Sequence, residues 1–359
     1  MSREATHAGT WYTDDGKELD EQLDGWLADV PNQISGIATT SKTEPPVSYP
    51  VDGARVIIAP HAGYSYSGPA AAWAYKAVDW SKCKRVFLLG PAHHIHLRGC
   101  ALSKLNKYET PLGDLILCPE TIKQLRATKK FTDMSQRDDE DEHSLEMHLP
   151  YIYKMLELCG HNPMPKLVPI LVGNITATQE ADYGKLLAPY LDDPTSIFVT
   201  SSDFCHWGTR FGYTYYQSNS NTSSGIQLGG GVAAPTSPAI HESIKVVDDL
   251  CMGAIETGSH QAFTDIIAQT RNTVCGRHPI GVVMAALEVL EKQSSHHEAG
   301  RFKFVRYERS DLCRTMRDSS VSYCSAYAVM PKEILHHGNG IQLPSPATQL
   351  RAFGGPLAI

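Results

Sequence analysis

Short runs of consecutive apolar residues alternate along the chain with longer segments of helical periodicity. The apolar runs predict buried strands at residues 55–59, 85–89, 167–172 and 196–200. Helices are predicted at residues 69–78, 119–130, 142–158, 179–191, 239–256, 260–271 and 279–293. Two further strands are expected near residues 301–308 and 321–330. Pro150 should kink the helix at 142–158 or begin a new one.

Apolar strands that alternate with helices are typical of a sheet covered on both faces. The sequence therefore predicts a single α/β domain with a mostly parallel or mixed central sheet, in which the last two strands add antiparallel pairing. We place the domain at residues 1–330, with surface insertions at about 32–53 and 217–238 and a flexible tail at 331–359. These three segments are rich in Ser, Thr, Asn, Gly or Pro and bury too little apolar surface to offset their ordering entropy.

Composition and charge limit which binding partners and cellular compartments are expected. The chain has 359 residues and a formal net charge of −7, which argues against nucleic acid as a general partner. It has no apolar run approaching the roughly 18–20 residues that a membrane helix needs, so we expect no membrane insertion. The polar N-terminus does not resemble a secretory signal, and nine cysteines without a CxxC pair indicate reduced thiols. A cytoplasmic location is predicted, with the nucleus as a second compartment.

Histidines follow three of the predicted strands. The runs RVIIA, RVFLL and SIFVT are followed within a few residues by His61, by His93, and by Asp203 with His206, respectively. Ligands of open α/β sheets bind outside the carboxyl ends of the strands. A single histidine at a strand end is usually a hydrogen-bonded loop residue, but three such strand ends indicate a shared site.

Two imidazoles and one anionic ligand suit a divalent metal ion with open coordination positions. The spacing of residues along the sequence does not identify the third ligand. The candidates are Asp203, His206, Glu146 and Cys275. A carboxylate in this position would favour Fe(II), whereas a thiolate would favour softer ions, with copper competing strongly.

An acidic segment, DDEDEHSLEMH at residues 138–148, is the second notable feature. Acidic residues favour the first turn of a helix. Glu142, His143 and Glu146 have the spacing to share one helix face, from which they could orient a histidine ligand. The segment lacks the HExxH pattern, so a zincin-type protease is not predicted.

Cys275 lies just before a predicted helix that has Pro279 in its first turn. A thiol near a helix N-terminus and beside Arg277 and His278 should have a lowered pKa. The functional interpretation is a thiolate ligand or a redox-active thiol, and the structural alternative is an inert buried cysteine.

Several motifs together resemble those of the Memo (mediator of cell motility) family: IIAPHAGYSYSGPAAAWAYK, LLGPAHH, DEDEHSLEMHLPY, VTSSDFCHWGTRF and CGRHPIGV. The insertions suggest a fungal member. The family's fold is similar to that of class III extradiol dioxygenases, which hold Fe(II) with two histidines and a glutamate. The resemblance implies that His61 and His93 are metal ligands and that Cys275 replaces the glutamate. It also implies that His206 occupies the position of the catalytic base, with Asp203 beside it.

The resemblance implies Fe(II) or copper as the cofactor, with zinc less favoured. A thiolate ligand is softer and itself oxidisable, so we expect a metal-dependent oxidoreductase rather than an ordinary extradiol dioxygenase. The family is linked with cell motility and cytoskeletal signalling, and animal members with phosphotyrosine segments of receptor kinases. The alternative is a non-enzymatic module that binds a peptide or sequesters metal in the same pocket, and a zinc hydrolase ranks third.

Overall fold

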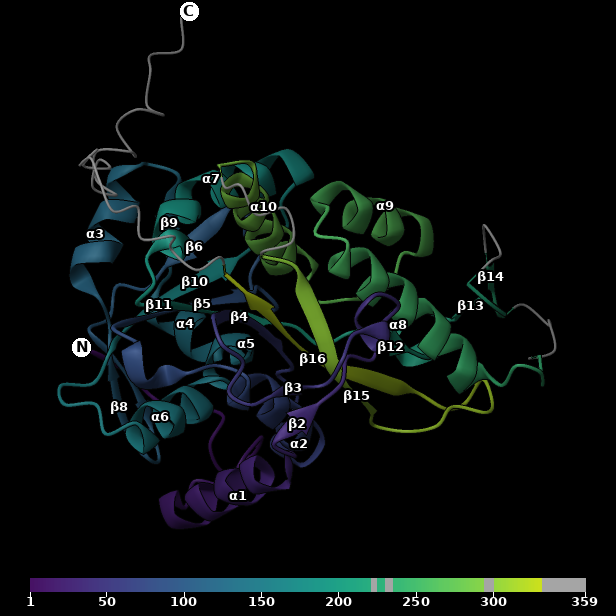
Figure 1. Cartoon of the computed structure of the whole chain (residues 1–359), viewed down its shortest axis with the longest axis horizontal. Coiled ribbons are helices and arrows are strands. Elements are labelled where there is room, and N and C mark those ends of the chain that lie inside the picture. Colours follow the sequence, from purple (N-terminus) through teal and green to yellow (C-terminus); the bar gives the residue numbers. More distant parts are fainter. Residues whose placement is uncertain (221–224, 230–234, 294–299, 331–359) are drawn as a thin grey trace, which may run out of the picture.

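The computed structural model describes residues 1–220, 225–229, 235–293 and 300–330. Its core is a nine-stranded mixed sheet with the order β12-β16-β4-β11-β5-β10-β6-β9, in which β15 pairs with β16 (Figure 1). The strands are β4 (Ala54–Ala59), β5 (Arg85–Pro91), β6 (Cys100–Leu102), β9 (Phe131–Asp133), β10 (Lys166–Val172), β11 (Ser196–Ser201), β12 (His206–Trp207), β15 (Phe302–Arg309) and β16 (Ser320–Val329).

The four central strands β4, β11, β5 and β10 are parallel, and nearly every residue in them is buried. This explains why their sequences are continuous apolar runs rather than alternating ones. The last two strands pair antiparallel, as the sequence predicts. The predicted mixed α/β domain is thereby confirmed.

Helices cover both faces of this sheet. The β4-to-β5 and β10-to-β11 crossovers run in opposite directions across the sheet, so right-handed connections place α2 (Tyr64–Lys76) and α7 (Ala177–Asp192) on opposite faces (Figure 1). Beside α7 lies α10 (Arg277–Gln293), while α1 (Gly16–Asp29) and α6 (Leu149–Leu158) pack on α2. The remaining helices are α3 (Pro119–Ala127), α4 (Gln136–Asp141), α5 (His143–Glu146), α8 (Ile240–Glu256) and α9 (His260–Thr270).

The predicted long helix at 142–158 is two helices, α5 and α6. Pro150 lies in the first turn of α6, where its missing N–H costs no hydrogen bond. The predicted helix at 69–78 begins earlier, at Tyr64, and Pro69 lies inside it. Small sheets complete the fold: β1 (Ser2–Arg3) with β7 (Lys107–Thr110) and β8 (Gly113–Ile116), β2 (Gln33–Ile34) with β3 (Val47–Ser48), and β13 (Tyr215–Tyr216) with β14 (Ile226–Gln227).

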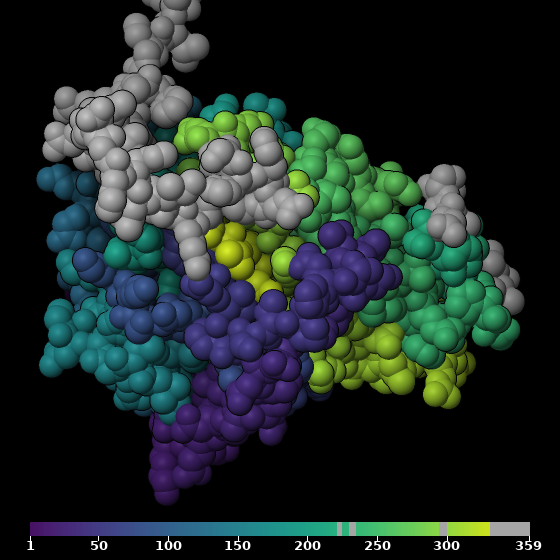
Figure 2. Space-filling view, in the orientation of Figure 1, coloured from purple at the N-terminus to yellow at the C-terminus, as the bar shows by residue number. Residues whose placement is uncertain are grey.

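The segment at 32–53 is packed, contrary to the expectation of poor order. Its middle contains a 3-10 helix, Ser41–Thr43, and the Glu256 carboxylate at the end of α8 accepts hydrogen bonds from the Ser41 hydroxyl, the Ser41 N–H and the Thr40 N–H. Figure 2 shows this segment lying across the face of the molecule next to α1. A buried carboxylate thus compensates for the low apolar content of the segment.

The other two segments fall partly or wholly outside the described residues. Residues 221–224 and 230–234 of the predicted insertion at 217–238 are not described, and neither is the predicted tail at 331–359. Within the described part, β14 pairs with β13, and Tyr215 and Tyr216 of β13 belong to a small second core with residues of α8. None of the described helices is long and apolar enough to cross a membrane.

Candidate metal centre

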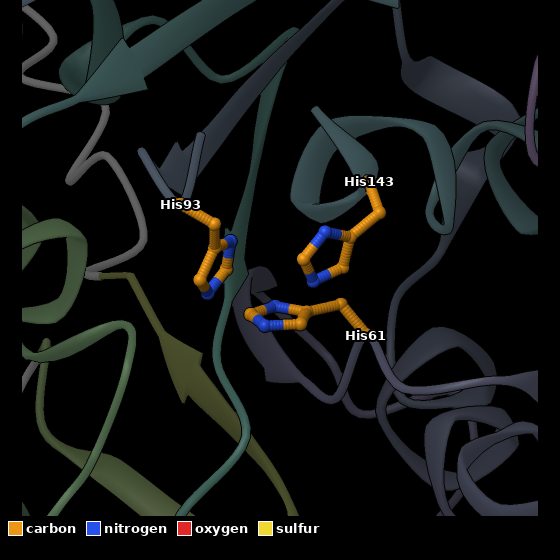
Figure 3. Close-up of side chains that lie close together, drawn as sticks. All are labelled: His61, His93 and His143. Atoms are coloured by element: carbon orange, nitrogen blue, oxygen red, sulfur yellow. The ribbon is translucent and has the colours of Figure 1, made fainter. Parts of the chain in front are cut away.

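Three histidines converge beyond the carboxyl ends of the central strands. His61 follows β4, His93 follows β5, and His143 begins α5. Their ring centroids lie 5.2 Å (His61–His93), 5.4 Å (His61–His143) and 4.3 Å (His93–His143) apart. One ligand nitrogen from each ring lies within 4.8 Å of the others, and Figure 3 shows the three rings pointing toward a common centre.

The tautomer of His61 is fixed by a chain of hydrogen bonds. The Ser201 hydroxyl donates its proton to the Ser144 carbonyl oxygen at 2.7 Å, so the His61 Nδ1–H must donate to Ser201 Oγ at 2.6 Å. This leaves the lone pair on Nε2. Burial, together with the neighbouring histidines, lowers the pKa of His61 well below its ordinary value. A neutral imidazole with a free Nε2 is the form that binds metal ions.

His93 is oriented by Glu142 at both its backbone and its ring. Glu142 Oε2 accepts from the His93 N–H at 2.7 Å, and Oε1 lies 2.8 Å from His93 Nδ1. Burial raises the pKa of Glu142, but the hydrogen bonds and charge of His93 outweigh it and hold this pKa at about 2. The ionised carboxylate therefore keeps the proton on Nδ1 and frees Nε2. The acidic segment thus supplies an orienting group for a histidine, as its sequence predicts.

His143 is the residue that sequence reasoning did not assign as a ligand. Its ring lies between His93 and Trp11, whose centroid is 4.5 Å away. Burial lowers the pKa of His143 to about 3, and its buried Nδ1 has no hydrogen-bond partner in the described structure. A buried polar nitrogen without a partner is costly unless a ligand satisfies it. The donor set of three imidazoles therefore fits a metal ion.

Cys275 lies next to this group, on the side of His61. Its Sγ is 3.2 Å from His61 Nε2 and accepts a hydrogen bond from the Asp203 N–H at 3.2 Å. The following Gly276 N–H donates to Ser202 Oγ at 3.0 Å and so fastens the Cys275 loop to the end of β11. The thiol adjoins the group at His61, but Cys275 is not among the described residues whose ligand atoms all lie within 4.8 Å of one another.

The predicted lowering of the Cys275 pKa is wrong. Burial raises this pKa well above its ordinary value, and the nearby Asp203 raises it further. One of the two expected neighbours, His278, contacts a different group, because its Nδ1 lies 2.6 Å from the Glu180 carboxylate. Sequence proximity placed His278 near the thiol, but the fold directs its ring toward Glu180 of α7.

Asp203 and His206, the predicted catalytic pair, lie on the Cys275 side of the centre. Asp203 Oδ1 accepts a hydrogen bond from the His61 N–H at 2.9 Å, and burial raises the pKa of Asp203. His206 Nδ1 donates to the carbonyl oxygens of Phe204 (2.8 Å) and Thr273 (3.1 Å), which leaves Nε2 able to accept a proton. His206 lies close enough to His61 and Asp203 to interact electrostatically with both.

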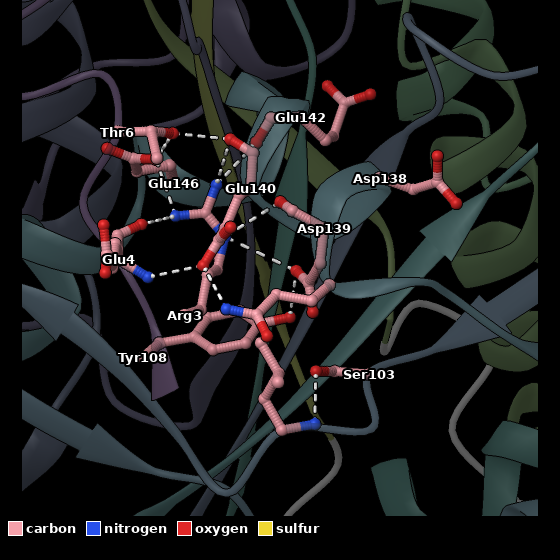
Figure 4. Close-up of polar contacts among 12 residues, drawn as sticks. Arg3, Glu4, Thr6, Ser103, Tyr108, Asp138, Asp139, Glu140, Glu142 and Glu146 are labelled. Carbon is pink, nitrogen blue, oxygen red and sulfur yellow. Dashed lines mark hydrogen bonds and ion pairs between the residues drawn. The ribbon is translucent and has the colours of Figure 1, made fainter. Parts of the chain in front are cut away.

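Glu146, one of the four candidate third ligands, serves a different purpose. Its buried carboxylate accepts hydrogen bonds from Arg3 Nη1 (2.6 Å), the His7 N–H (2.9 Å) and the Tyr12 hydroxyl (2.9 Å). Figure 4 shows the Arg3 guanidinium enclosed by the acidic segment. These contacts fasten residues 3–12, which include Trp11, onto the segment that carries the metal-site histidine of α5. Sequence reasoning missed this role because the two segments lie more than a hundred residues apart.

Comparison with known proteins identifies the family. The family model described as Memo-like protein matches residues 3–327. The chain belongs to the Memo family. It is 44% identical over 330 residues to protein MEMO1 of Xenopus tropicalis, covering 92% of this chain and 98% of that protein. It is 42% identical to human protein MEMO1 (90% and 96% covered) and 41% identical to the protein memo-1 homolog of Caenorhabditis elegans (90% and 81% covered).

Among solved structures, an uncharacterized protein from Escherichia coli K12 overlaps with 69% of this chain and 90% of its own, at 14% identity and a TM-score of 0.37.

Proposed function

We propose that this Memo-family protein binds iron or copper at a centre formed by His61, His93 and Cys275, with His143 as an additional ligand. The observation that supports this proposal is the convergence of nitrogens of His61, His93 and His143 within 4.8 Å of one another, with Cys275 Sγ 3.2 Å from His61 Nε2. Two of the rings have their Nε2 lone pairs freed by fixed hydrogen bonds at Nδ1. A hydrogen bond at the other ring nitrogen orients a ligand histidine, and such hydrogen bonds typically improve metal affinity about 10–100-fold.

The donor types favour a redox-active ion. Imidazole suits copper, iron and zinc, whereas a thiolate selects softer ions, and copper outcompetes zinc at equal geometry. Iron or copper is therefore our proposal, with zinc ranked behind them. When bound, the ion would supply Lewis-acid or one-electron redox chemistry.

The residues around the centre support an oxidoreductase role. His206 Nε2 is free to accept a proton from a bound substrate, since Nδ1 is committed to two carbonyl oxygens. Asp203 fixes the backbone of His61 and donates its own N–H to the thiol of Cys275. We therefore propose His206 as the general base and Asp203 as its neighbour in the predicted catalytic pair.

A cavity of about 290 Å³ supports the peptide-binding form of the second candidate, the non-enzymatic module that binds a peptide or sequesters metal. Its lining includes Arg210, Phe211, Tyr66, Tyr323 and Ser320, and the Phe211 ring lies 5.3 Å from that of His206. An arginine with hydroxyl and aromatic neighbours suits a phosphorylated aromatic side chain. A phosphotyrosine segment of a signalling protein is therefore the partner proposed, in the cytoplasm or nucleus and linked to cell motility.

Oxygen uptake separates the two candidates. We expect iron- or copper-loaded protein to consume oxygen over several turnovers with a suitable reductant, and His206→Gln to retain its metal but lose turnover. The matched control is His96→Gln, an exposed histidine whose side chain bonds Arg98. Stoichiometric metal or phosphopeptide binding without turnover would favour the module. Unchanged turnover in His206→Gln would overturn the proposed base.

A further inference from the structure

A carboxylate lies on the buried face of helix α8. Asp248 is 0% exposed, and it shares this face with Ile244, Val247, Cys251 and Ile255. Charged side chains are rarely buried so completely, because burial removes their hydration and must be offset by hydrogen bonds. The hydrogen-bond partners of this carboxylate therefore indicate what its burial achieves.

One oxygen of Asp248 joins two segments of the candidate site. Oδ1 accepts a hydrogen bond from the Cys205 N–H at 3.2 Å and another from Asn272 Nδ2 at 3.0 Å. Oδ2 accepts from the Tyr307 hydroxyl at 2.9 Å. Cys205 is 1% exposed, so its N–H would be buried without an acceptor if the carboxylate were removed.

The same two segments hold the ring of His206. Its Nδ1 donates to the carbonyl oxygens of Phe204 at 2.8 Å and Thr273 at 3.1 Å. The Phe204 carbonyl and the Cys205 N–H belong to one peptide group. This group therefore accepts from His206 on one side and donates to Asp248 on the other.

Hydrogen bonds arranged in series reinforce one another. A peptide group whose N–H is bonded to a carboxylate has a more polarised carbonyl oxygen, which is then a better acceptor. Asp248 can thereby strengthen the bond to His206 Nδ1 without touching the ring. Its second partner, Asn272, directly precedes Thr273, so both carbonyl oxygens that orient the ring lie next to a group that Asp248 binds.

We propose that Asp248 is a positioning residue for His206, and that it acts through the Phe204–Cys205 peptide group to keep the proton on Nδ1 and the lone pair on Nε2. In a direct carboxylate–histidine pair, the carboxylate fixes the tautomer and the orientation of the base. Here a peptide group lies between the two side chains. This inference rests on the proposed role of His206 as a general base.

The tautomer of His206 tests the proposal in the full chain without added metal. Nitrogen-15 NMR of histidine-labelled protein at mildly alkaline pH distinguishes the two neutral tautomers, and the spectrum of His206→Gln assigns the His206 signals. Wild type should show a single tautomer with the proton on Nδ1. Asp248→Ala should lose this fixed tautomer, so that the shifts of the two ring nitrogens move toward each other. Asp248→Asn should retain most of it, because its amide oxygen can still accept from the Cys205 N–H.

A matched control separates positioning from stability. Glu256 lies on the same helix, is 2% exposed, and accepts hydrogen bonds from the Ser41 hydroxyl and the Phe304 N–H. Glu256→Ala should therefore lose stability in urea unfolding, as Asp248→Ala should, but it should keep the wild-type signals of His206.

The outcomes separate this inference from the function on which it rests. A proton on Nε2 in wild type would overturn the proposal even if Asp248→Ala does not fold. Wild-type His206 signals in folded Asp248→Ala, or an equal change in Glu256→Ala, would overturn it as well. Wild-type turnover in His206→Gln is a different result, which would remove the general-base role but would leave the effect of Asp248 on the ring as measured.

Discussion

Replacing Arg3 by methionine should destabilise the whole chain, although Arg3 lies only two residues from its start. The Arg3 and Glu146 side chains are both 0% exposed and are joined at 2.6 Å. Methionine fills much of the same volume but leaves the Glu146 charge without its guanidinium. Removing one partner of a buried ion pair typically costs about 3–5 kcal/mol in the free energy of unfolding.

This cost converts to a measurable shift in melting temperature. At about 2.1 cal/mol/K per residue, the unfolding entropy of 359 residues is roughly 0.75 kcal/mol/K. A loss of about 3–5 kcal/mol in the free energy of unfolding should therefore lower the melting temperature by about 4–7 °C. Urea unfolding and thermal melts at pH 7 measure both quantities. The matched control is Arg126→Met, because Arg126 forms a 2.7 Å ion pair with Asp133 that is 37% and 42% exposed. Such exposed ion pairs contribute about 0–1 kcal/mol to the free energy of unfolding.

The effect of the Arg3 substitution should depend on pH. Burial raises the pKa of Glu146, but His7 and Arg3 outweigh it and lower this pKa from 4.5 to about 2. The stabilisation by this carboxylate is therefore complete above pH 4.5 and is lost as the pH falls toward 2. The difference between wild type and Arg3→Met should shrink over that interval. An Arg3 variant no less stable than Arg126→Met at pH 7, or a difference that does not change with pH, would refute this reasoning.

Three further substitutions test other parts of the structure. Glu142→Gln should weaken metal affinity about 10–100-fold in a competition titration, because it removes the charge that orients a ligand histidine, and an unchanged affinity would contradict that role. Gly276→Ala should lower the melting temperature and the metal content, since its Cβ would lie 2.3 Å from the Ser201 carbonyl oxygen; wild-type values of both would show that the loop tolerates a side chain. Glu256→Gln should accelerate limited proteolysis near Ser41 by weakening charge-assisted hydrogen bonds, whereas an unchanged cleavage rate would mean that other contacts hold the segment.

The predictable parts of the structure are those set by local pattern. Continuous apolar runs identified the central strands, and the rule that ligands bind beyond strand carboxyl ends brought His61 and His93 together. Pro150 indicated the start of a helix because a proline lacks the backbone N–H, and this property of a single residue can be read from the sequence. Each of these inferences needed only neighbouring residues and a general property of parallel sheets.

The parts that were missed depend on contacts between distant segments. His143 lies in the acidic segment, which Arg3 of the distant N-terminal segment contacts on both sides of His143, at the Glu142 carbonyl and the Glu146 carboxylate. The pKa of Cys275 follows burial, which the adjacent sequence does not reveal. Packing of the 32–53 segment requires Glu256, about 200 residues away in the sequence.

The metal content of untagged protein purified anaerobically tests the central claim most directly. Elemental analysis should find close to one iron or copper per chain in wild type and in the His96→Gln control. It should find little in His61→Gln and less than wild type in Cys275→Ser. No iron or copper in wild type after reconstitution, or equal amounts in wild type and His61→Gln, would contradict a metal centre built on His61.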